Sequence, residues 1–370
     1  MKSTVCWRNK FFSVGMTVFL MLLISACTPG NGPGPQAPAA APGKYVYVNN
    51  DASTNYVSAF SINADGTLVQ LAGSPYATGG AGYDGYYATN KIALAPVKRL
   101  LFASNAADST IAVFSINQTD GTLTQVGAPV ASGGTMSSGG SLAVDTNENY
   151  LFAGNFGEQS IAVFAISMGG VLSPVTGSPF NVGEQADGIT MNPAGNILYA
   201  IRPSLAVLSM ATDGSLSHIT GSPFAINGTS LAFGSSTMLF SAEPGGVLSS
   251  YAIDASGAPT LLDTLTIGGN SQAVTTTRNG GLAILSGGGD SQISVLNVAA
   301  DGTLTQVAGS PFVTAAVMYG YSVANPSGTF LYATETTQIE GFSIGADGAL
   351  TSLGTFPLTN PGLARSLVIY

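Results

Sequence analysis

One short cassette occurs seven times along this chain, and that count constrains the fold more than any other feature of the sequence. Each copy begins with an apolar tetrad whose third residue is aromatic or Ile. These third residues are Tyr47, Phe102, Phe152, Tyr199, Phe240, Ile284 and Tyr332. They recur about every 47 residues, which is typical of a four-stranded β-propeller blade. The repeat therefore predicts an all-β fold, a seven-bladed propeller of four-stranded antiparallel blades.

A second, alternating strand follows each tetrad, most clearly at residues 111–116 and 161–166. A turn with glycine at a fixed place comes next. The seven turns are Asp65-Gly66, Asp120-Gly121, Gly169-Gly170, Asp213-Gly214, Ser256-Gly257, Asp301-Gly302 and Asp347-Gly348. Because glycine adopts positive φ angles at little cost, these pairs predict tight hairpins between the second and third strands of the cassette.

The third strand of the cassette ends in a proline motif, which is typical of the outer strand of a sheet. Gly-Ser-Pro-aromatic stands at residues 73–76, 177–180, 221–224 and 309–312. An innermost strand follows each cassette, and the last one is residues 366–369 at the carboxyl end. No innermost strand precedes the first tetrad, which begins at Tyr45. We therefore expect the carboxyl-terminal strand to pair with the first strand and close the ring.

The amino terminus has the pattern of an export signal. Lys2, Arg8 and Lys10 precede an apolar run at residues 11–24, which is short for a membrane span. Ile24-Ser25-Ala26-Cys27 then resembles a bacterial lipobox, in which the cysteine becomes lipid-modified. The alternative is an ordinary secretory signal in which Cys27 is incidental.

These features predict three parts of the chain. Residues 1–26 are a lipoprotein signal peptide, residues 27–43 are lipidated Cys27 with a Pro/Gly-rich tether, and residues 44–370 are the propeller. We expect an exported monomer attached to a bacterial membrane through the lipid on Cys27. Because Thr28 rather than aspartate follows the cysteine, the outer membrane or the cell surface is favoured over the inner membrane.

The charge of the chain argues against nucleic acid as a partner. The sequence has 10 basic and 19 acidic residues, and three of the basic ones lie in the signal, so the mature chain carries a net charge of −12. An acidic surface repels phosphate backbones and anionic lipid headgroups. A small molecule, a glycan or a protein is the expected partner.

Several motifs carry a resemblance to a known family. They are the strand pair at residues 150–155 and 160–164 and the Asp-Gly-Thr-Leu hairpins at Asp65, Asp120 and Asp301. Residues 44–370 resemble the lactonase-type seven-bladed propellers, which include bacterial 6-phosphogluconolactonase and the Tyr-Val-Thr-Asn repeat surface proteins. The resemblance implies lactone hydrolysis with Arg and His around the central opening.

In the segments that precede the innermost strands, Arg365 is the basic residue that this comparison retains. The one histidine, His218, is expected on an outer strand, facing solvent. We therefore expect neither a histidine acid/base nor a cluster of phosphate-binding basic groups near the axis. No cofactor or metal is expected, and the catalytic residues stay unassigned.

The longer loops lead from outer to innermost strands, and loops on a rigid scaffold are where binding groups usually reside. The candidate ligand-binding residues in these loops are Tyr83, Asp84, Tyr86, Tyr87, Glu184, Asp187, Tyr319, Tyr321 and Arg365. Glu184 and Asp187 can hold a divalent cation, act as acid and base, or be solvated loop charges. The tyrosines either pack over the channel mouth or stack on a sugar or peptide. Arg365 either pairs with an acidic neighbour or holds a substrate.

Three functions are compatible with these observations. We favour a lipid-anchored extracytoplasmic propeller that binds a ligand or partner without catalysis. The first alternative is a lactonase like the enzymes of the similar family. The second is a structural or adhesion module of the cell envelope.

Overall fold

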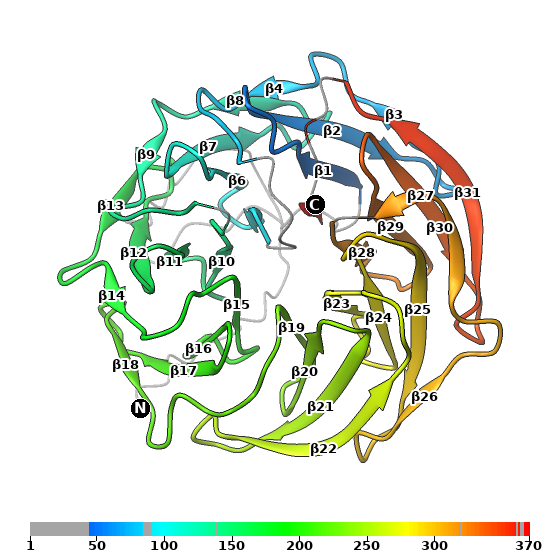
Figure 1. The fold of residues 1–370 in the computed structure, drawn as a ribbon. Coiled ribbons are helices and arrows are strands. Elements are labelled where there is room, and N and C mark those ends of the chain that lie inside the picture. The colour runs from blue at the N-terminus through cyan, green and yellow to red at the C-terminus, as the bar shows by residue number, and fades with distance from the viewer. Residues whose placement is uncertain (1–43, 84–89, 138, 319, 360–361, 363–365) are drawn as a thin grey trace, which may run out of the picture. The chain divides into compact units, whose positions relative to one another are not determined.

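The computed structural model describes residues 44–83, 90–137, 139–318, 320–359, 362 and 366–370. Within them the chain forms seven antiparallel sheets arranged as blades around a central axis (Figure 1). The innermost strands are β5 (Ile92–Ala95), β10 (Leu142–Val144), β15 (Gly188–Met191), β19 (Ser230–Ser235), β23 (Ala273–Thr276), β28 (Ser322–Ala324) and β32 (Ser366–Ile369). The predicted seven-bladed all-β fold is confirmed.

The tetrads form the second strand of each blade, and the alternating segments form the third. The second strands are β1 (Tyr45–Asn49), β6 (Leu100–Asn105), β11 (Tyr150–Asn155), β16 (Ile197–Ile201), β20 (Met238–Glu243), β24 (Leu282–Ser286) and β29 (Phe330–Thr334). The third strands are β2 (Tyr56–Ile62), β7 (Thr110–Ile116), β12 (Ser160–Ile166), β17 (Leu205–Met210), β21 (Val247–Ile253), β25 (Asp290–Val298) and β30 (Gln338–Ile344). These two layers hold most of the buried apolar side chains.

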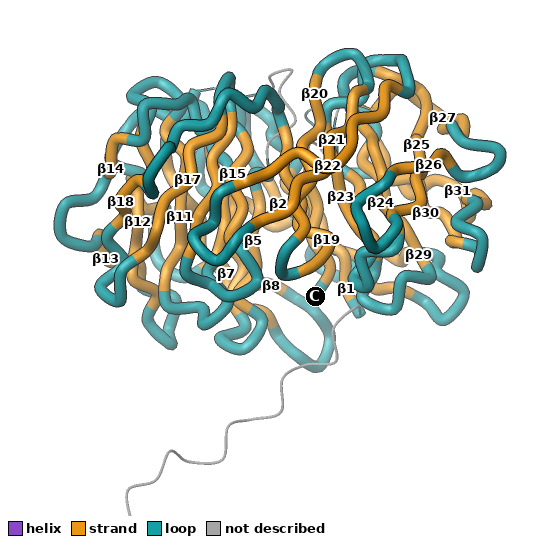
Figure 2. Tube along the Cα trace, turned by 90° about the horizontal axis from the view of Figure 1, so that it is seen from below, coloured by secondary structure: helices purple, strands orange, loops and turns teal. Residues whose placement is uncertain are grey.

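The outer strands complete the blades. They are β3 (Leu68–Gln70), β8 (Leu123–Gln125), β13 (Leu172–Pro174), β18 (Leu216–His218), β22 (Pro259–Thr266), β26 (Leu304–Gln306) and β31 (Leu350–Pro357). Four further segments also pair with the third strands: β4 (Tyr76–Ala77), β9 (Val130–Ala131), β14 (Phe180–Asn181) and β27 (Phe312–Met318). The blades are seen edge-on in Figure 2, where loops gather at the two ends of the strands. His218 lies exposed on β18, as predicted.

The two ends of the propeller meet in one sheet, whose strand order is β3-β2-β1-β32. β32 is antiparallel to β1, with Tyr47 opposite Val368 and Val48 opposite Leu367. The Tyr370 carbonyl oxygen also accepts hydrogen bonds from the backbone N–H groups of Lys44, at 2.8 Å, and Tyr45, at 2.9 Å. This is the predicted closure of the ring.

In three of the seven blades, a tyrosine at the third tetrad position joins the blade to the next one. The hydroxyl groups of Tyr47, Tyr199 and Tyr332 donate to the carbonyl oxygens of Gly121, Gly257 and Gly66, at 2.8, 2.9 and 2.8 Å. Each acceptor is the hairpin glycine of the following blade. The hairpin at Gly121 shows why glycine is needed there, because its φ is 75° and a Cβ would lie 2.4 Å from the ring of Tyr45.

The Gly-Ser-Pro motif has a role that the sequence did not reveal. The hydroxyl oxygens of Ser74, Ser178, Ser222 and Ser310 accept the backbone N–H of Ala59, Val163, Val207 and Val295, each at 2.9 Å. All four donors lie in third strands. The serine therefore satisfies a backbone group where the proline motif interrupts the ladder.

No helix among the described residues is both long enough and apolar enough to span a membrane. The predicted signal peptide, Cys27 and the tether lie within residues 1–43, outside the described residues.

Deletion of residues 365–370 is expected to unfold or aggregate the propeller, because it removes the innermost strand of the closing blade and exposes the edge of β1. Thermal melting and size-exclusion chromatography check this. A truncated chain that stays monomeric with an unchanged melting curve would contradict it.

Tyr332→Phe is expected to lower the free energy of unfolding by about 1–3 kcal/mol, because the buried Gly66 carbonyl loses its donor. Tyr150→Phe is the matched control. The Tyr150 hydroxyl also donates to a hairpin carbonyl at 2.8 Å, but in an exposed setting, so this change should cost about 0.5 kcal/mol or less. Urea unfolding measures both, and equal losses would count against the role of burial.

Candidate functional site

Polar side chains gather where the chain enters the innermost strands, at one end of the central axis. We call this end the axial mouth and define it by Asp51, Lys91, Asp187, Arg202 and Tyr321. Lys91, Asp187 and Tyr321 directly precede β5, β15 and β28, while Asp51 and Arg202 follow the ends of β1 and β16. Because all blades share one strand direction, these positions lie at the same end of the ring.

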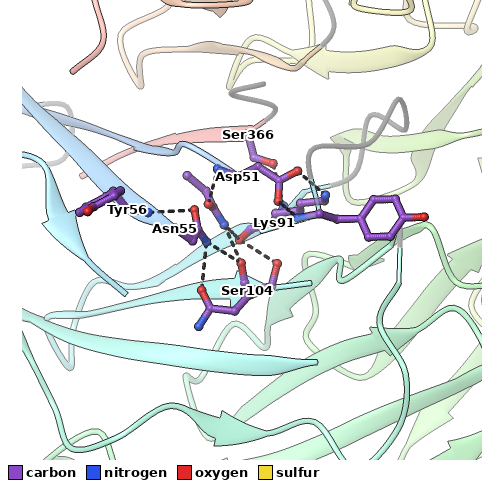
Figure 3. A network of polar contacts seen from close by, with 9 residues as sticks. Asp51, Asn55, Tyr56, Lys91, Ser104 and Ser366 are labelled. Atoms are coloured by element: carbon purple, nitrogen blue, oxygen red, sulfur yellow. Dashed lines mark hydrogen bonds and ion pairs between the residues drawn. The ribbon is translucent and has the colours of Figure 1, made fainter. Parts of the chain in front are cut away.

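A buried ion pair links the closing blade to the next one. The Nζ of Lys91 lies 2.6 Å from Oδ2 of Asp51, and both side chains are fully buried (Figure 3). Oδ1 of Asp51 accepts the backbone N–H of Tyr83 at 3.0 Å, and the backbone N–H of Lys91 donates to the hydroxyl oxygen of Ser366 at 2.8 Å. The pair is therefore neutral, fixed, and in contact with the carboxyl-terminal strand.

Two asparagine side chains bond the backbone around this ion pair. Asn49 Nδ2 donates to the carbonyl oxygens of Lys91, at 2.9 Å, and Ser104, at 3.0 Å. Asn55 Nδ2 also donates to the Ser104 carbonyl, at 3.1 Å (Figure 3). Asn55 Oδ1 accepts the backbone N–H of Tyr56 at 2.9 Å. These bonds run between β1, β2 and β6, so they hold the two blades in one register.

A second ion pair lies at the end of β16. Asp187 Oδ2 contacts the guanidinium of Arg202, whose side chain is 23% exposed, and the guanidinium also lies over the ring of Phe156. Arg202 has a φ of 131°, a region that non-glycine residues rarely occupy.

The other carboxylate oxygen of Asp187, Oδ1, is not part of this ion pair. Oδ1 is buried and accepts no hydrogen bond among the described residues. Burial raises the pKa of Asp187 to about 6, although the charges of Arg202 and Lys91 lower it. The hydroxyl of Ser271, which is also buried and close to an innermost strand, lacks a partner in the same described part. Buried polar atoms of this kind normally meet a ligand or an ordered water.

Tyr321 adds a phenol to the same end of the axis. Burial raises its pKa to about 12, the Ser230 side chain lowers it, and the charge of Asp187 raises it again. Tyr321 is therefore neutral at physiological pH and can donate a hydrogen bond.

The structure separates the predicted site residues. Asp187 and Tyr321 share the axial mouth, whereas Glu184 accepts the backbone N–H of Ser204 at 3.3 Å. Glu184 and Asp187 are both buried, so the interpretation of them as solvated loop charges is wrong. Tyr83 is half exposed. The remaining candidates, Asp84, Tyr86, Tyr87, Tyr319 and Arg365, lie outside the described residues. Over the described ranges, no three acidic, His or Cys side chains converge as a metal site would need.

Sequence reasoning missed Asp51, Lys91 and Arg202. Lys91 and Arg202 lie at this end of the axis, where the sequence led us to expect no cluster of basic groups. Lys91 could have been found from its place directly before an innermost strand. Arg202 gave a weaker signal, since it follows a second strand rather than preceding a first one.

A separate depression of about 500 Å³ lies between two blades at the opposite ends of the strands. Arg278, Asn279, Asn297 and Ser327 line it, on the turns between innermost and second strands and their neighbours. It shares no residue with the axial mouth.

The fold and the axial mouth define a closed propeller with a polar axial site, and comparisons with known proteins show what the chain is similar to. Residues 25–136 match the family described as lactonase, 7-bladed beta-propeller. No curated protein matches the chain. By this match the first part of the chain has the sequence pattern of the lactonase-type seven-bladed propellers, and the remaining described strands complete the same fold.

Solved structures share this fold at low sequence identity. A Bacteroides fragilis protein described as a candidate 6-phosphogluconolactonase has 17% identity and a TM-score of 0.73, with 90% of this chain and 99% of that chain covered. A similar candidate from Bacteroides uniformis has 15% identity and a TM-score of 0.74, covering 89% and 99%. The periplasmic gluconolactonase of Pseudomonas aeruginosa has 16% identity and a TM-score of 0.70, covering 89% and 99%.

Lys91→Met is expected to lower the free energy of unfolding by about 3–5 kcal/mol, because it leaves the Asp51 carboxylate buried without a counter-charge. The double variant Lys91→Met/Asp51→Asn should recover part of this loss, since Asn is neutral and tolerates the φ of 52° at position 51. Urea unfolding compares them. Additive losses in the double variant would contradict the pairing.

Proposed function

We propose that this protein is an exported, lipid-anchored propeller that binds a neutral, hydroxyl-bearing small molecule, such as a sugar or sugar lactone, at the axial mouth. The observation that carries the proposal is the buried Oδ1 of Asp187, which lies beside the paired Arg202 and has no hydrogen-bond partner in the part of the chain that the structure describes. A ligand hydroxyl can donate to this oxygen, and the Tyr321 phenol and Ser271 hydroxyl can bond further ligand oxygens.

The charges of the axial mouth favour a neutral ligand. Lys91 is neutralised by Asp51 and Arg202 by Asp187, so the two described cations there are already paired. A phosphorylated sugar would have to compete with those carboxylates for its counter-charge. This argument separates the proposed ligand from the phosphorylated lactone in the descriptions of the Bacteroides proteins.

The proposed location rests on the amino terminus. The basic segment, the apolar run and the lipobox-like Ile24-Ser25-Ala26-Cys27 support export and acylation of Cys27. The acidic mature chain and the fold similarity to a gluconolactonase described as periplasmic agree with an extracytoplasmic site. Mass spectrometry of the membrane fraction, for acylated Cys27, tests this part.

Asp187→Asn is expected to weaken binding of a neutral sugar probe by about 10- to 100-fold, because one hydrogen bond to a charged acceptor is lost. Titration calorimetry with D-glucose, D-galactose and D-gluconate, the last as a charged comparison, measures it. Glu184→Gln is the matched control and should bind normally, since Glu184 contacts the Ser204 backbone. Unchanged affinity in Asp187→Asn, or no binding of any neutral probe, would refute the proposal.

Hydrolysis of a sugar lactone is the second candidate, and the pKa of Asp187 favours it. A carboxylate with a pKa of about 6 can take a proton from water near neutral pH. The water oxygen would then form a bond to the lactone carbonyl carbon. The bond from that carbon to the ring oxygen would break, and Asp187 would return the proton it took from water to the ring oxygen as it leaves.

If this reaction occurs, its rate should rise with pH through about 6 and level off above it, because Asp187 is protonated below that value and cannot act as a base. A pH-stat assay with D-glucono-1,5-lactone, corrected for spontaneous opening, follows the acid released. Asp187→Asn should abolish turnover and Glu184→Gln should retain it. Binding without turnover leaves the non-catalytic function, while turnover that survives Asp187→Asn removes this residue from the chemistry.

A further inference from the structure

Two buried glutamates take no part in the proposed function. Glu335 follows the end of β29 and is fully buried, and Glu340 lies in β30 with 3% of its surface exposed. Carboxylates this deep in a protein are usually paired with a cation. The donors recorded for these two are neutral, so the pair needs another explanation.

Backbone N–H groups of one neighbouring segment bond both carboxyl groups. The Ala315 N–H donates to Oε2 of Glu340 and the Ala316 N–H to Oε1 of Glu335, each at 2.8 Å. Both alanines lie in β27, which pairs with β25 of the preceding blade. The two glutamates therefore join one blade to the chain segment that enters it.

The remaining bonds leave room for one shared proton. Gln338 Nε2 donates to Oε2 of Glu335, and the Ser352 hydroxyl donates to Oε1 of Glu340 at 2.6 Å. The two carboxyl groups also lie close enough for Glu340 to raise the pKa of Glu335. Two carboxylates that meet in a buried space repel each other, and a proton held between them replaces this repulsion with a hydrogen bond.

The repeat shows that Glu340 is an exception. It stands opposite the fourth tetrad residue, Ala333. In the other six blades the third-strand residue at that position is Ser58, Ala112, Ala162, Ala206, Ser249 or Ser294. Six small residues fit a buried layer, so the glutamate is not a requirement of the fold.

The segment held by these glutamates leads to the axial mouth. Beyond Ala316, the Thr336 hydroxyl donates to the Val317 carbonyl at 3.4 Å, and the Thr334 N–H donates to the Tyr321 carbonyl at 3.1 Å. Thr334 directly precedes Glu335. The turn that contains Glu335 therefore contacts the chain at Val317 in β27 and again at Tyr321.

We propose that Glu335 and Glu340 share a single proton and form an acid-dependent clasp that fixes β27 and positions Tyr321 at the axial mouth. Loss of the proton places two negative charges in one buried space. The clasp then opens, β27 loosens, and the support of Tyr321 weakens.

The sign of the pH dependence follows from the direction of one pKa shift. Burial raises the pKa of Glu335, with a further rise from Glu340, while the bonds from Gln338 and Ala316 lower it. The clasp thus contributes full stability below the ordinary glutamate pKa and loses it as pH rises through the raised value. The neighbouring strands β27, β29, β31 and β32 carry no charged residue, and Asp290 at the start of β25 adds negative charge.

Hydrogen exchange of the full-length protein between pH 5 and 8, corrected for intrinsic exchange, tests the clasp. Protection of the Ala315 and Ala316 amides should fall with rising pH, by up to about tenfold per pH unit, the slope that one proton gives. Peptides from the Asp347-Gly348 hairpin of the same blade should show no such slope. Flat protection of these two amides in the wild-type protein would overturn the proposal without any variant.

Two substitutions at Glu340 separate the proton from the packing. Glu340→Gln keeps an acceptor for Ala315 and supplies a permanent donor to Glu335, so protection should stay high and independent of pH. Glu340→Ala restores the small residue of the other blades and should give low protection that is also independent of pH. A wild-type slope in either variant would overturn the clasp.

Glu148→Gln is the control for loss of a buried carboxylate in general. Glu148 is also buried, and it accepts the backbone N–H groups of Val97 and Lys98, each at 2.8 Å. It should leave the slope at Ala315 and Ala316 unchanged. A lost slope in this variant would mean that the pH dependence comes from global stability, which also counts against the clasp.

Discussion

The pairing of β32 with β1 is the interaction on which the rest of the structure depends. Without it the first blade lacks its innermost strand, and the ring has two open edges. The same pairing builds the axial mouth, because Ser366 in β32 accepts the N–H of Lys91, and Asp51 follows β1 by two residues. Residues from the first blade, the second blade and the carboxyl end thus become neighbours only in the closed ring. Closure of the ring therefore completes the first blade and also brings the residues of the axial mouth together.

Sequence reasoning predicted the architecture well because the repeat is written in residue types with strong local meaning. Glycine turns, apolar tetrads and terminal proline motifs each limit the backbone, and seven copies in one period leave few alternatives. The interblade bonds were harder to predict. Tyr47 and Phe102 hold the same tetrad position, yet only a tyrosine can donate to the next hairpin. Likewise, the serine of Gly-Ser-Pro looks like part of a turn until its oxygen is seen beside a third-strand N–H.

The axial mouth was predicted only in part, because some of its residues are far apart in the sequence and meet only in the folded ring. Asp187 and Tyr321 were identifiable because they precede innermost strands. Asp51 and Lys91 are 40 residues apart, and their contact depends on how two blades are rotated against each other. A sequence pattern places each residue at one end of a strand but does not say which side chains meet. Burial was also hidden, since loop carboxylates such as Glu184 and Asp187 would ordinarily be solvated.

In a repeat protein, each residue can be compared with the residues at the same position of the other repeats. In this chain, two buried charged residues differ from their equivalents in the other blades. In each blade, one residue of the innermost strand pairs with the fourth residue of the tetrad, and Lys91 comes directly before that residue in its blade. At the same position the other blades carry Ser141, Gly188, Ser230, Ala273, Tyr321 and Ser366. Glu340 departs from six Ala or Ser residues in the same way. The fold does not require either charge, and burying a charge is costly. Each therefore needs a compensating contact, and each has one at a boundary between blades. In this propeller, the residues that depart from the repeat lie where neighbouring blades contact each other and where the axial mouth carries charged side chains.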